Sequence, residues 1–552
     1  MKTISRITLF VALTVIVLGA NSRTLCDIIL RPSANGSPVI TAALEAAKPG
    51  ETIRLQKGLY PEYLTITKPV TLIGEKGAVI DVSKPINLPW TPANDIGPGV
   101  YRAQVSERPA ALFIDGKTLA QIDPTRDETT DQKGRFYWKT IMTKGMHLSG
   151  YKLIRGVYMY QEAEKAILLH LADDERPEAH VWTAVTTKQA AVRFMNANNA
   201  HVRGLEIRHG FTGVFFGQNS NKCSLEKCTI CPWDEDGVDV KEGASNCRIE
   251  SCDISRGSLE DWTKFEHEPY TYETWEVHKT AGFYDRVGIY LLGAGVGTRI
   301  HGNYIHEVFD GVDLTDANSE TPEGWYLPGW TENPDANRDT EIWENGLINC
   351  RDSGMEFCGP SINIRVHHNL LKHTVGGLRY KVPRYGPLFL YYNTLIDGTP
   401  FNFFISMDDS ACEAYIYHNT VVGGDEAVFY PEWETPRFIG CQNFHFINNV
   451  FVAPRYGYLH GDYFGKPDRP RFTTDYNVVV GDNRPYPGDK YRDQHSKYVD
   501  SAKLAPGLEP KPLPGSPAIE AGLDLSTYLH GYPLPGCPPG YFKGKAPNIG
   551  AY

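Results

Sequence analysis

A short pattern, apolar-x-x-Asn-x-apolar, recurs along the chain at a period of roughly 22 to 28 residues. Clear copies contain Asn303, Asn345, Asn369, Asn393, Asn419 and Asn449, and the series extends to Asn477. Two earlier copies have Cys228 and Cys252 in the asparagine position. Asn tolerates the left-handed backbone of a tight bend, and stacked amides can bond to one another. The repeat therefore predicts a solenoid of short strands, one asparagine bend per turn.

The two ends of the chain carry further patterns. One pattern comprises residues 42–53, 58–60, 69–73 and 78–81. Segments 515–522 and 548–552 form the other end. Together with the asparagine series, they resemble the right-handed parallel β-helix, or pectin-lyase-like, superfamily of secreted carbohydrate-active enzymes. The resemblance implies an all-β fold with an N-terminal cap. It does not choose a reaction, because the fold hosts lyases, hydrolases, epimerases and non-enzymes.

The N-terminal 22 residues have the pattern of a signal peptide. Lys2 and Arg6 precede an apolar run over 7–20, which is too short for a membrane span, and small residues follow it. We expect a secreted or periplasmic protein of one domain, residues 23–552, acting as a monomer. The net charge of −11 argues against nucleic-acid binding. It does not exclude an acidic polysaccharide as partner, because a local basic cluster can sit on an acidic protein.

Three segments depart from the repeat. Residues from about 111 to 183 alternate like strands of a small β-rich insertion. Residues 257–285 and 317–339 form long loops, and long loops in a tight repeat are usually functional. Both loops are rich in aromatics, and we expect Trp262, Trp275, Trp325 and Trp330 to bind sugar rings. The alternative is that these rings pack within their own loops.

A second series of strands, each beginning with Gly and an apolar residue, follows the bends. Alternation places every second side chain outward. The predicted outward column is Phe215, Asp239, Tyr290, Asp313, Glu356, Arg379 and Asn402. Beside it run Lys241, Leu292, Thr315, Cys358 and Lys381. Carboxylates and cations concentrated on one strip predict a catalytic site, whereas a solvated salt-bridge ladder would be the structural alternative.

Two reactions fit this strip. In glycoside hydrolysis two carboxyl groups flank the bond, and their separation sets the stereochemistry. Asp313 and Glu356 on adjacent rungs suit a retaining pair, and Asp239 and Asp313, two rungs or about 9.6 Å apart, suit an inverting pair. We favour hydrolysis, which needs no cofactor, because carboxylates occupy the centre of the strip.

In the lyase alternative, Lys241, Arg379 or Lys381 would neutralise a uronate or remove its C5 proton. Asp234 and Asp236, with Asp239 and Asp313, would then hold Ca²⁺, which prefers oxygen ligands. A non-catalytic glycan-binding protein is a third hypothesis. His306 and His373 precede successive strands of the strip and are further candidates for substrate contact. Cys223 and Cys247, like Cys228 and Cys252, are expected on adjacent rungs, as stacked thiols or disulfides.

Overall fold

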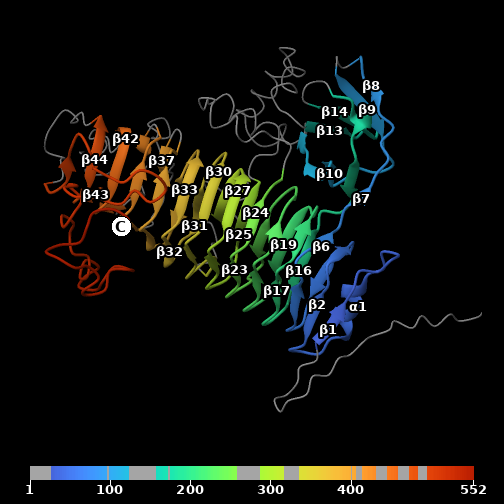
Figure 1. Cartoon of the computed structure of the whole chain (residues 1–552), viewed down its shortest axis with the longest axis horizontal. Helices are drawn as coiled ribbons and strands as arrows, with labels where there is room; N and C mark the ends of the chain where they lie inside the picture. The colour runs from blue at the N-terminus through green and yellow to red at the C-terminus, as the bar shows by residue number, and fades with distance from the viewer. Residues whose placement is uncertain are drawn as a thin grey trace, which may run out of the picture.

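The predicted solenoid is present. A computed structural model describes residues 27–95, 99–122, 157–171, 175–257, 286–315, 335–398, 401–405, 413–424, 426–429, 444–457, 472–482 and 494–552. Most of the strands lie in parallel register with the next coil, which confirms the all-β solenoid expected from the repeat. Figure 1 shows the coils stacked along the long axis of the molecule from the N-terminal to the C-terminal end.

Each regular coil contributes one strand to each of three rows. The back row is a 13-stranded parallel sheet. Its strands are β1 (Asp27–Leu30), β2 (Thr52–Leu55), β5 (Thr71–Gly74), β17 (His201–Arg203), β20 (Ser224–Glu226), β23 (Arg248–Glu250), β26 (Arg299–His301), β29 (Glu341–Trp343), β32 (Ile364–His367), β35 (Leu388–Tyr391), β38 (Ala414–Tyr417), β41 (Phe444–Ile447) and β43 (Phe472–Asp475).

The middle row follows the asparagine bend. Its strands are β3 (Gly58–Tyr60), β6 (Ala78–Asp81), β18 (Glu206–Arg208), β21 (Thr229–Ile230), β24 (Asp253–Ser255), β27 (Tyr304–Val308), β30 (Gly346–Cys350), β33 (Leu370–Thr374), β36 (Thr394–Ile396), β39 (Thr420–Val422), β42 (Val450–Gly457), β44 (Val478–Asp482) and β45 (Lys497–Tyr498). The cleft row comes next along each coil. Its strands are β4 (Leu64–Ile66), β16 (Ala190–Met195), β19 (Thr212–Gly217), β22 (Val238–Lys241), β25 (Val287–Leu292), β28 (Asp310–Thr315), β31 (Met355–Pro360), β34 (Leu378–Arg384), β37 (Phe401–Ile405) and β40 (Glu426–Phe429).

Asparagine side chains hold the coils together at the bend between the back and middle rows. The left-handed backbone expected at the asparagine is adopted instead by the residue before it, as at His368 (φ 55°) and Tyr392 (φ 54°). Asn369 Nδ2 donates to Asn393 Oδ1 (3.0 Å), and Asn393 Nδ2 donates to Asn419 Oδ1 (3.0 Å). The same amides also donate to backbone carbonyls of the preceding coil, as Asn393 does to Val366 (2.9 Å). The series runs from Asn303 to Asn477. Each buried amide has partners on both sides, so the ladder costs no unsatisfied polar group.

Glycines form a second column, where the chain enters the cleft row. A β-carbon added at Gly237 would lie 2.5 Å from the carbonyl oxygen of Gly288, and one at Gly311 would lie 2.4 Å from that of Gly354. No real β-carbon fits at such distances, so these positions require glycine. This close approach explains why the strands of the cleft row align on a glycine followed by an apolar residue.

The N-terminal helix α1 (Val39–Ala46) packs over the first coils. Its first turn is fastened by Glu62, whose carboxylate accepts from the backbone N–H groups of Ile40 and Thr41 (both 2.8 Å). The carboxylate thus satisfies donors that a helix leaves unpaired at its start. No helix in the described part of the chain has the length and hydropathy of a membrane-spanning segment.

Two small sheets, mainly antiparallel, and a short helical turn η2 (Pro177–Ala179) interrupt the early coils and project from the N-terminal part of the solenoid (Figure 1). Their strands are β7 (Lys84–Pro85), β8 (Thr91–Pro92), β9 (Val100–Gln104), β10 (Ala111–Ile114), β11 (Lys117–Thr118), β12 (Ala120–Ile122), β13 (Val157–Gln161), β14 (Ala166–His170) and β15 (Trp182–Val185). The expected start at about residue 111 is therefore too late. The first strands are short and proline-bearing, so alternation does not reveal them, and it is pairing with β14 and β15 that defines them.

Candidate active site

An open cleft of about 800 Å³ lies along the outer face of the cleft row. Its floor is formed by side chains from β16, β19, β22, β25, β28 and β31. The outward column is in continuous register: Phe215 pairs with Asp239, Asp239 with Tyr290, Tyr290 with Asp313, Asp313 with Glu356, and Glu356 with Arg379. The predicted order of these six residues is thus confirmed, and all of them except Arg379 line the cleft.

Two carboxyl groups meet at the N-terminal side of the cleft centre. Asp236 precedes β22 and Asp239 lies on it, and both are almost fully buried, at 4% exposed each. They share a hydrogen bond, and burial together with the charge of Asp239 raises the pKa of Asp236 well above its ordinary value. Burial also raises the pKa of Asp239. The pair therefore holds a proton at a pH where isolated carboxyl groups have lost theirs.

A lysine and an aromatic ring complete this group. Lys241 Nζ lies 3.3 Å from Asp239 Oδ1 and 3.8 Å from Asp236 Oδ2. The same ammonium group lies 4.6 Å from the centre of the Tyr290 ring. Thr212 Oγ1 lies 3.5 Å from the other oxygen of Asp239. The positive charge of Lys241 is thus used to balance the two carboxyl groups.

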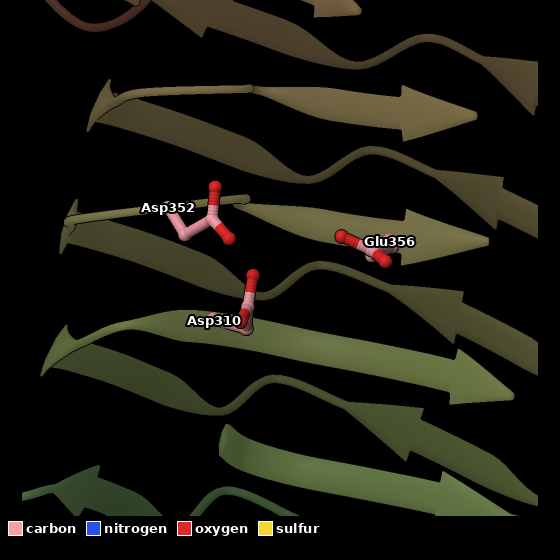
Figure 2. A group of neighbouring side chains, drawn as sticks. All are labelled: Asp310, Asp352 and Glu356. Carbon is pink, nitrogen blue, oxygen red and sulfur yellow. The ribbon is translucent and has the colours of Figure 1, made fainter. Parts of the chain in front are cut away.

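Three more carboxylates gather between the rung of Asp313 and the next rung. Asp310, Asp352 and Glu356 are buried, and each offers an oxygen within 4.8 Å of the others. Figure 2 shows Asp310 and Asp352 facing each other from neighbouring rungs, with Glu356 farther along the strand that follows Asp352. Asp310 accepts from the backbone N–H of Ser353 (2.9 Å), just as Asp236 accepts from that of Val287 (3.2 Å). The two groups are therefore built on one repeated Asp-Gly-Val-Asp segment.

Arg379 supplies the positive charge for this second group. Its Nη1 lies 3.2 Å from Glu356 Oε2 and 3.4 Å from Asp352 Oδ1. Ser353 Oγ donates to the same oxygen of Glu356 (3.2 Å). This single guanidinium group offsets only part of the charge of the three carboxylates, and it occupies oxygens of Asp352 and Glu356 that a calcium ion would need as ligands.

The regular part of the chain matches a known family. Residues 190–382 fit the model described as "Right handed beta helix region". That stretch is a right-handed parallel β-helix. It includes every rung of the outward column from Arg193 to Arg379. No curated protein matches this chain in sequence.

Solved structures that resemble the β-helix chain are distant in sequence. The complex of XylC with xylose is 12% identical, with a TM-score of 0.46 and 84% of each chain covered. A structure described as "Glycoside hydrolase" is 10% identical, with a TM-score of 0.44, covering 82% of this chain and 96% of the other. A pectate lyase is 13% identical, with a TM-score of 0.42, covering 95% and 96% of the two chains.

Two predicted members of the strip are wrong because the β-helix becomes irregular at β34. Arg379 pairs with Phe404, not with Asn402. Asn402 is fully buried; its oxygen accepts from Gly398 N (3.2 Å) and its amide donates to Gly423 O (3.0 Å), so it secures turns. The register also shifts after Tyr380, so that Val382 rather than Lys381 pairs with Cys358.

The two histidines are also misplaced by the sequence argument. His306 pairs in register with Ile348, which pairs with Lys372, so His373 is not its equivalent. His306 Nε2 lies 3.0 Å from Asp253 Oδ1, and His373 Nε2 lies 3.8 Å from Asp397 Oδ2. Neither residue lines the cleft. Both histidines lie on the middle row, one bend before the cleft row.

The four predicted metal ligands do not form one compact group, although Asp236 and Asp239 meet. Among the described residues, the one acidic group compact enough for an ion is Asp310, Asp352 and Glu356, and it omits Asp234 and Asp236. Asp234 is buried outside the cleft lining, and burial raises its pKa despite the nearby charges of Arg286 and Arg256. Asp236 faces Asp239 and Lys241 instead. Trp262, Trp275, Trp325 and Trp330 lie outside the described residues, with all of loop 258–285 and most of loop 317–339.

Sequence reasoning missed several cleft residues. No role was predicted for Asp310, which lines the cleft and repeats the position of Asp236 in the Asp-Gly-Val-Asp segment, or for Asp352, which contacts Arg379 outside the cleft lining. Lys188 and Arg193 were missed as well. Arg193 pairs with Phe215, so extending the column by one rung toward the N-terminus would have found it.

Four of the cysteines stack in pairs on neighbouring coils. Cys223 and Cys247 lie on adjacent rungs, as do Cys228 and Cys252, linked by backbone bonds from Arg248 to Cys223 and from Asp253 to Cys228 (both 2.9 Å). The eight cysteines in the described ranges are free thiols, seven of them buried. Burial raises the pKa of the Cys247 thiol above its ordinary value, which keeps it protonated and unreactive.

Proposed function

We propose that this protein is an exported glycoside hydrolase that cleaves polysaccharide within the cleft. The observation that carries the proposal is the placement of Asp239 and Asp313 two rungs apart in one outward column, with a proton-sharing partner, Asp236, beside the first. Hydrolysis of a glycosidic bond needs one protonated and one ionised carboxyl group on opposite sides of the bond.

The Asp236–Asp239 pair suits the general acid. Its members are buried, and the pKa of each is raised, so the pair retains a proton at a higher pH than an isolated carboxyl group does. Asp239 faces the cleft and can deliver that proton to the leaving oxygen, after which Lys241 at 3.3 Å stabilises the carboxylate that remains. The proton that leaves is the one Asp239 shares with Asp236, and the pair takes up a new proton from water before the next turnover.

Asp313 suits the general base. Two rungs separate it from Asp239, about 9.6 Å between α-carbons, which leaves room for an attacking water and implies inversion at the anomeric carbon. Glu356, one rung farther on, contacts Arg379 and Ser353, and its carboxylate stabilises positive charge on the sugar in the transition state. Tyr290 lies between the two catalytic rungs and contacts the bound sugar.

A retaining mechanism would use Asp313 and Glu356, which are adjacent in register. Their α-carbons lie about 4.8 Å apart, near the separation typical of a nucleophile and an acid–base pair. In that case Glu356 would have to carry the proton, and its contact with Arg379 opposes this. The two mechanisms predict opposite anomers.

Charge pairing weighs against a lyase. Elimination at a uronate needs a proton acceptor and a cation or metal that neutralises the carboxylate. Lys241 is held between two carboxyl groups and Arg379 contacts two others, so neither is available for a substrate carboxylate at the centre of the cleft.

A panel of neutral, uronic and sulfated polysaccharides tests the proposal. We expect new reducing ends without ultraviolet absorbance, and inversion of the anomer seen by proton NMR at early times. Asp313→Asn serves as the inactive control. Absorbance of an unsaturated product would identify a lyase, retention would move the chemistry to Asp313 and Glu356, and binding without cleavage of any glycan would indicate a non-catalytic protein.

A further inference from the structure

The charges along the cleft are unevenly distributed. At its N-terminal end the lining includes Lys188, on the loop before β16, and Arg193, on β16 itself. At its centre the lining includes Asp236, Asp239, Asp310, Asp313 and Glu356, with one lysine, Lys241. One end of the cleft is therefore basic and its centre is strongly acidic.

The two cations at the basic end differ from Lys241 and Arg379 in their partners. Arg193 Nη2 lies 3.0 Å from Thr65 Oγ1 and 2.9 Å from the side-chain oxygen of Gln189, in the amide orientation that satisfies both groups. Both partners are neutral. Within the ranges that the structure describes, no carboxylate oxygen lies within 4 Å of a side-chain nitrogen of Lys188 or Arg193. Arg193 is thus fixed in place while its charge stays uncompensated.

Aromatic rings lie beside these cations. Lys188 Nζ is 5.3 Å from the centre of the Phe211 ring, and Phe215 follows Arg193 in the outward column. Both rings line the cleft and are partly exposed. An aromatic face suits the apolar face of a sugar, and a guanidinium group suits a carboxylate or sulfate through paired hydrogen bonds. The basic end therefore offers both an aromatic surface for the sugar ring and positive charge for its carboxylate or sulfate group.

Arg193 lies two rungs from Asp239, about 9.6 Å between α-carbons, so one oligosaccharide can reach both. The acidic centre repels a densely charged chain, because like charges at close range cost free energy in a partly buried site. We propose that Lys188, Arg193, Phe211 and Phe215 form a subsite for an anionic sugar, and that the substrate is a glycan whose cleaved bond joins neutral sugars and which carries isolated carboxylate or sulfate groups. This rests on the proposed hydrolase function.

Binding to an inactive enzyme tests the subsite separately from catalysis. The Asp313→Asn protein is measured by affinity electrophoresis against glucuronoxylan and its carboxyl-reduced form, and against a sulfated galactan and its desulfated form. Polygalacturonate serves as the densely charged comparison. The double variant Lys188→Gln/Arg193→Gln is compared with Lys76→Gln, which removes an exposed charge outside the cleft.

We expect at least one acidic polymer to bind about tenfold or more tightly than its neutralised form, and the double variant to lose that preference while Lys76→Gln keeps it. The carboxylate and sulfate arms identify which anion is preferred. Equal binding of charged and neutralised forms, binding to none of the acidic polymers, or tightest binding to polygalacturonate would overturn the proposal. The parent protein could cleave no glycan while the double variant still loses the preference for the acidic polymer. That result would support the subsite and reject the hydrolase function.

Discussion

Two columns of polar side chains run along the same β-helix, and they differ in how their members are satisfied. The asparagine ladder repeats one residue from Asn303 to Asn477, and each member bonds to an identical neighbour. The outward column changes at nearly every rung, from Arg193 through Asp239 and Tyr290 to Glu356. A structural column needs the same hydrogen bond on every coil, whereas a catalytic column needs different groups at chosen heights. Repetition thus marks stability here, and variation marks the site.

The largest expected effect belongs to the outward column. Asp313→Asn removes the proposed base, and we expect kcat/KM to fall by about 10²–10⁴-fold with an unchanged melting temperature. Asp253→Asn, which changes an exposed carboxylate outside the cleft, is the matched control. Steady-state kinetics and thermal unfolding measure the two effects. If the Asp313→Asn protein has a lower melting temperature but an unchanged kcat/KM, Asp313 has a structural role instead.

An asparagine-to-aspartate substitution tests the asparagine ladder. In Asn393→Asp the amide that donates to Val366 O and Asn419 Oδ1 is replaced by a carboxylate facing those acceptors. We expect a loss of about 3–5 kcal/mol in unfolding free energy at neutral pH. Specific activity per folded molecule should stay constant. Burial raises the pKa of the new carboxyl, so the loss grows as pH rises through and above the ordinary carboxyl range and shrinks in acid.

Exposed Asn199→Asp is the control for this substitution. Denaturant unfolding at several pH values compares the two variants. If both variants have the same unfolding free energy at neutral pH, the hydrogen bonds of the ladder do not contribute to the stability of the fold.

A smaller effect is expected from Asp236→Asn, which separates the proton-sharing pair. The new amide can accept from Val287 N as before and donate to Asp239, which lowers the pKa of Asp239. The alkaline limb of kcat/KM should therefore move to lower pH. An unchanged limb in the pH profile would show that the pair does not supply the catalytic proton.

The stability of this variant has an expected sign too. A carboxyl whose folded pKa is raised opposes folding increasingly as pH rises above the ordinary carboxyl range. Removing Asp236 should therefore leave the melting temperature at neutral pH equal to or above that of the parent, and the two proteins should converge in acid. A lower melting temperature at neutral pH would contradict the raised pKa of Asp236.

The smallest effect concerns the N-terminal limit of the ladder. Cys252 occupies the asparagine position, and its backbone N–H already donates to Asn303 Oδ1 (2.9 Å). Cys252→Asn adds an amide that can reach Asn303 and Leu225 O, and we expect a gain of about 1 kcal/mol in thermal or denaturant unfolding. Cys247→Asn, at a buried position outside the ladder, should instead destabilise. Equal behaviour of the two variants would show that the ladder position carries no advantage.

Much of the site's location follows from local rules. Because side chains alternate along a strand and parallel coils stack in register, six consecutive members of the outward column are predictable from the glycine-led strands. The rule fails at Asn402 and Lys381. Gly377 adopts a left-handed backbone (φ +48°), and β34 carries a bulge, so the spacing between glycine and column is not preserved there.

The sequence by itself determined the solenoid, the asparagine bend and the face that carries the carboxylates, because each depends on a pattern within one coil that repeats in the next. Only the tertiary structure decided which charges meet. Asp236 meets Asp239 and Lys241, Arg379 contacts Glu356 and Asp352, and Arg193 faces neutral partners. These pairings depend on side-chain directions and distances between residues from different coils, to which the electrostatic free energy is sensitive and which no single-coil pattern encodes.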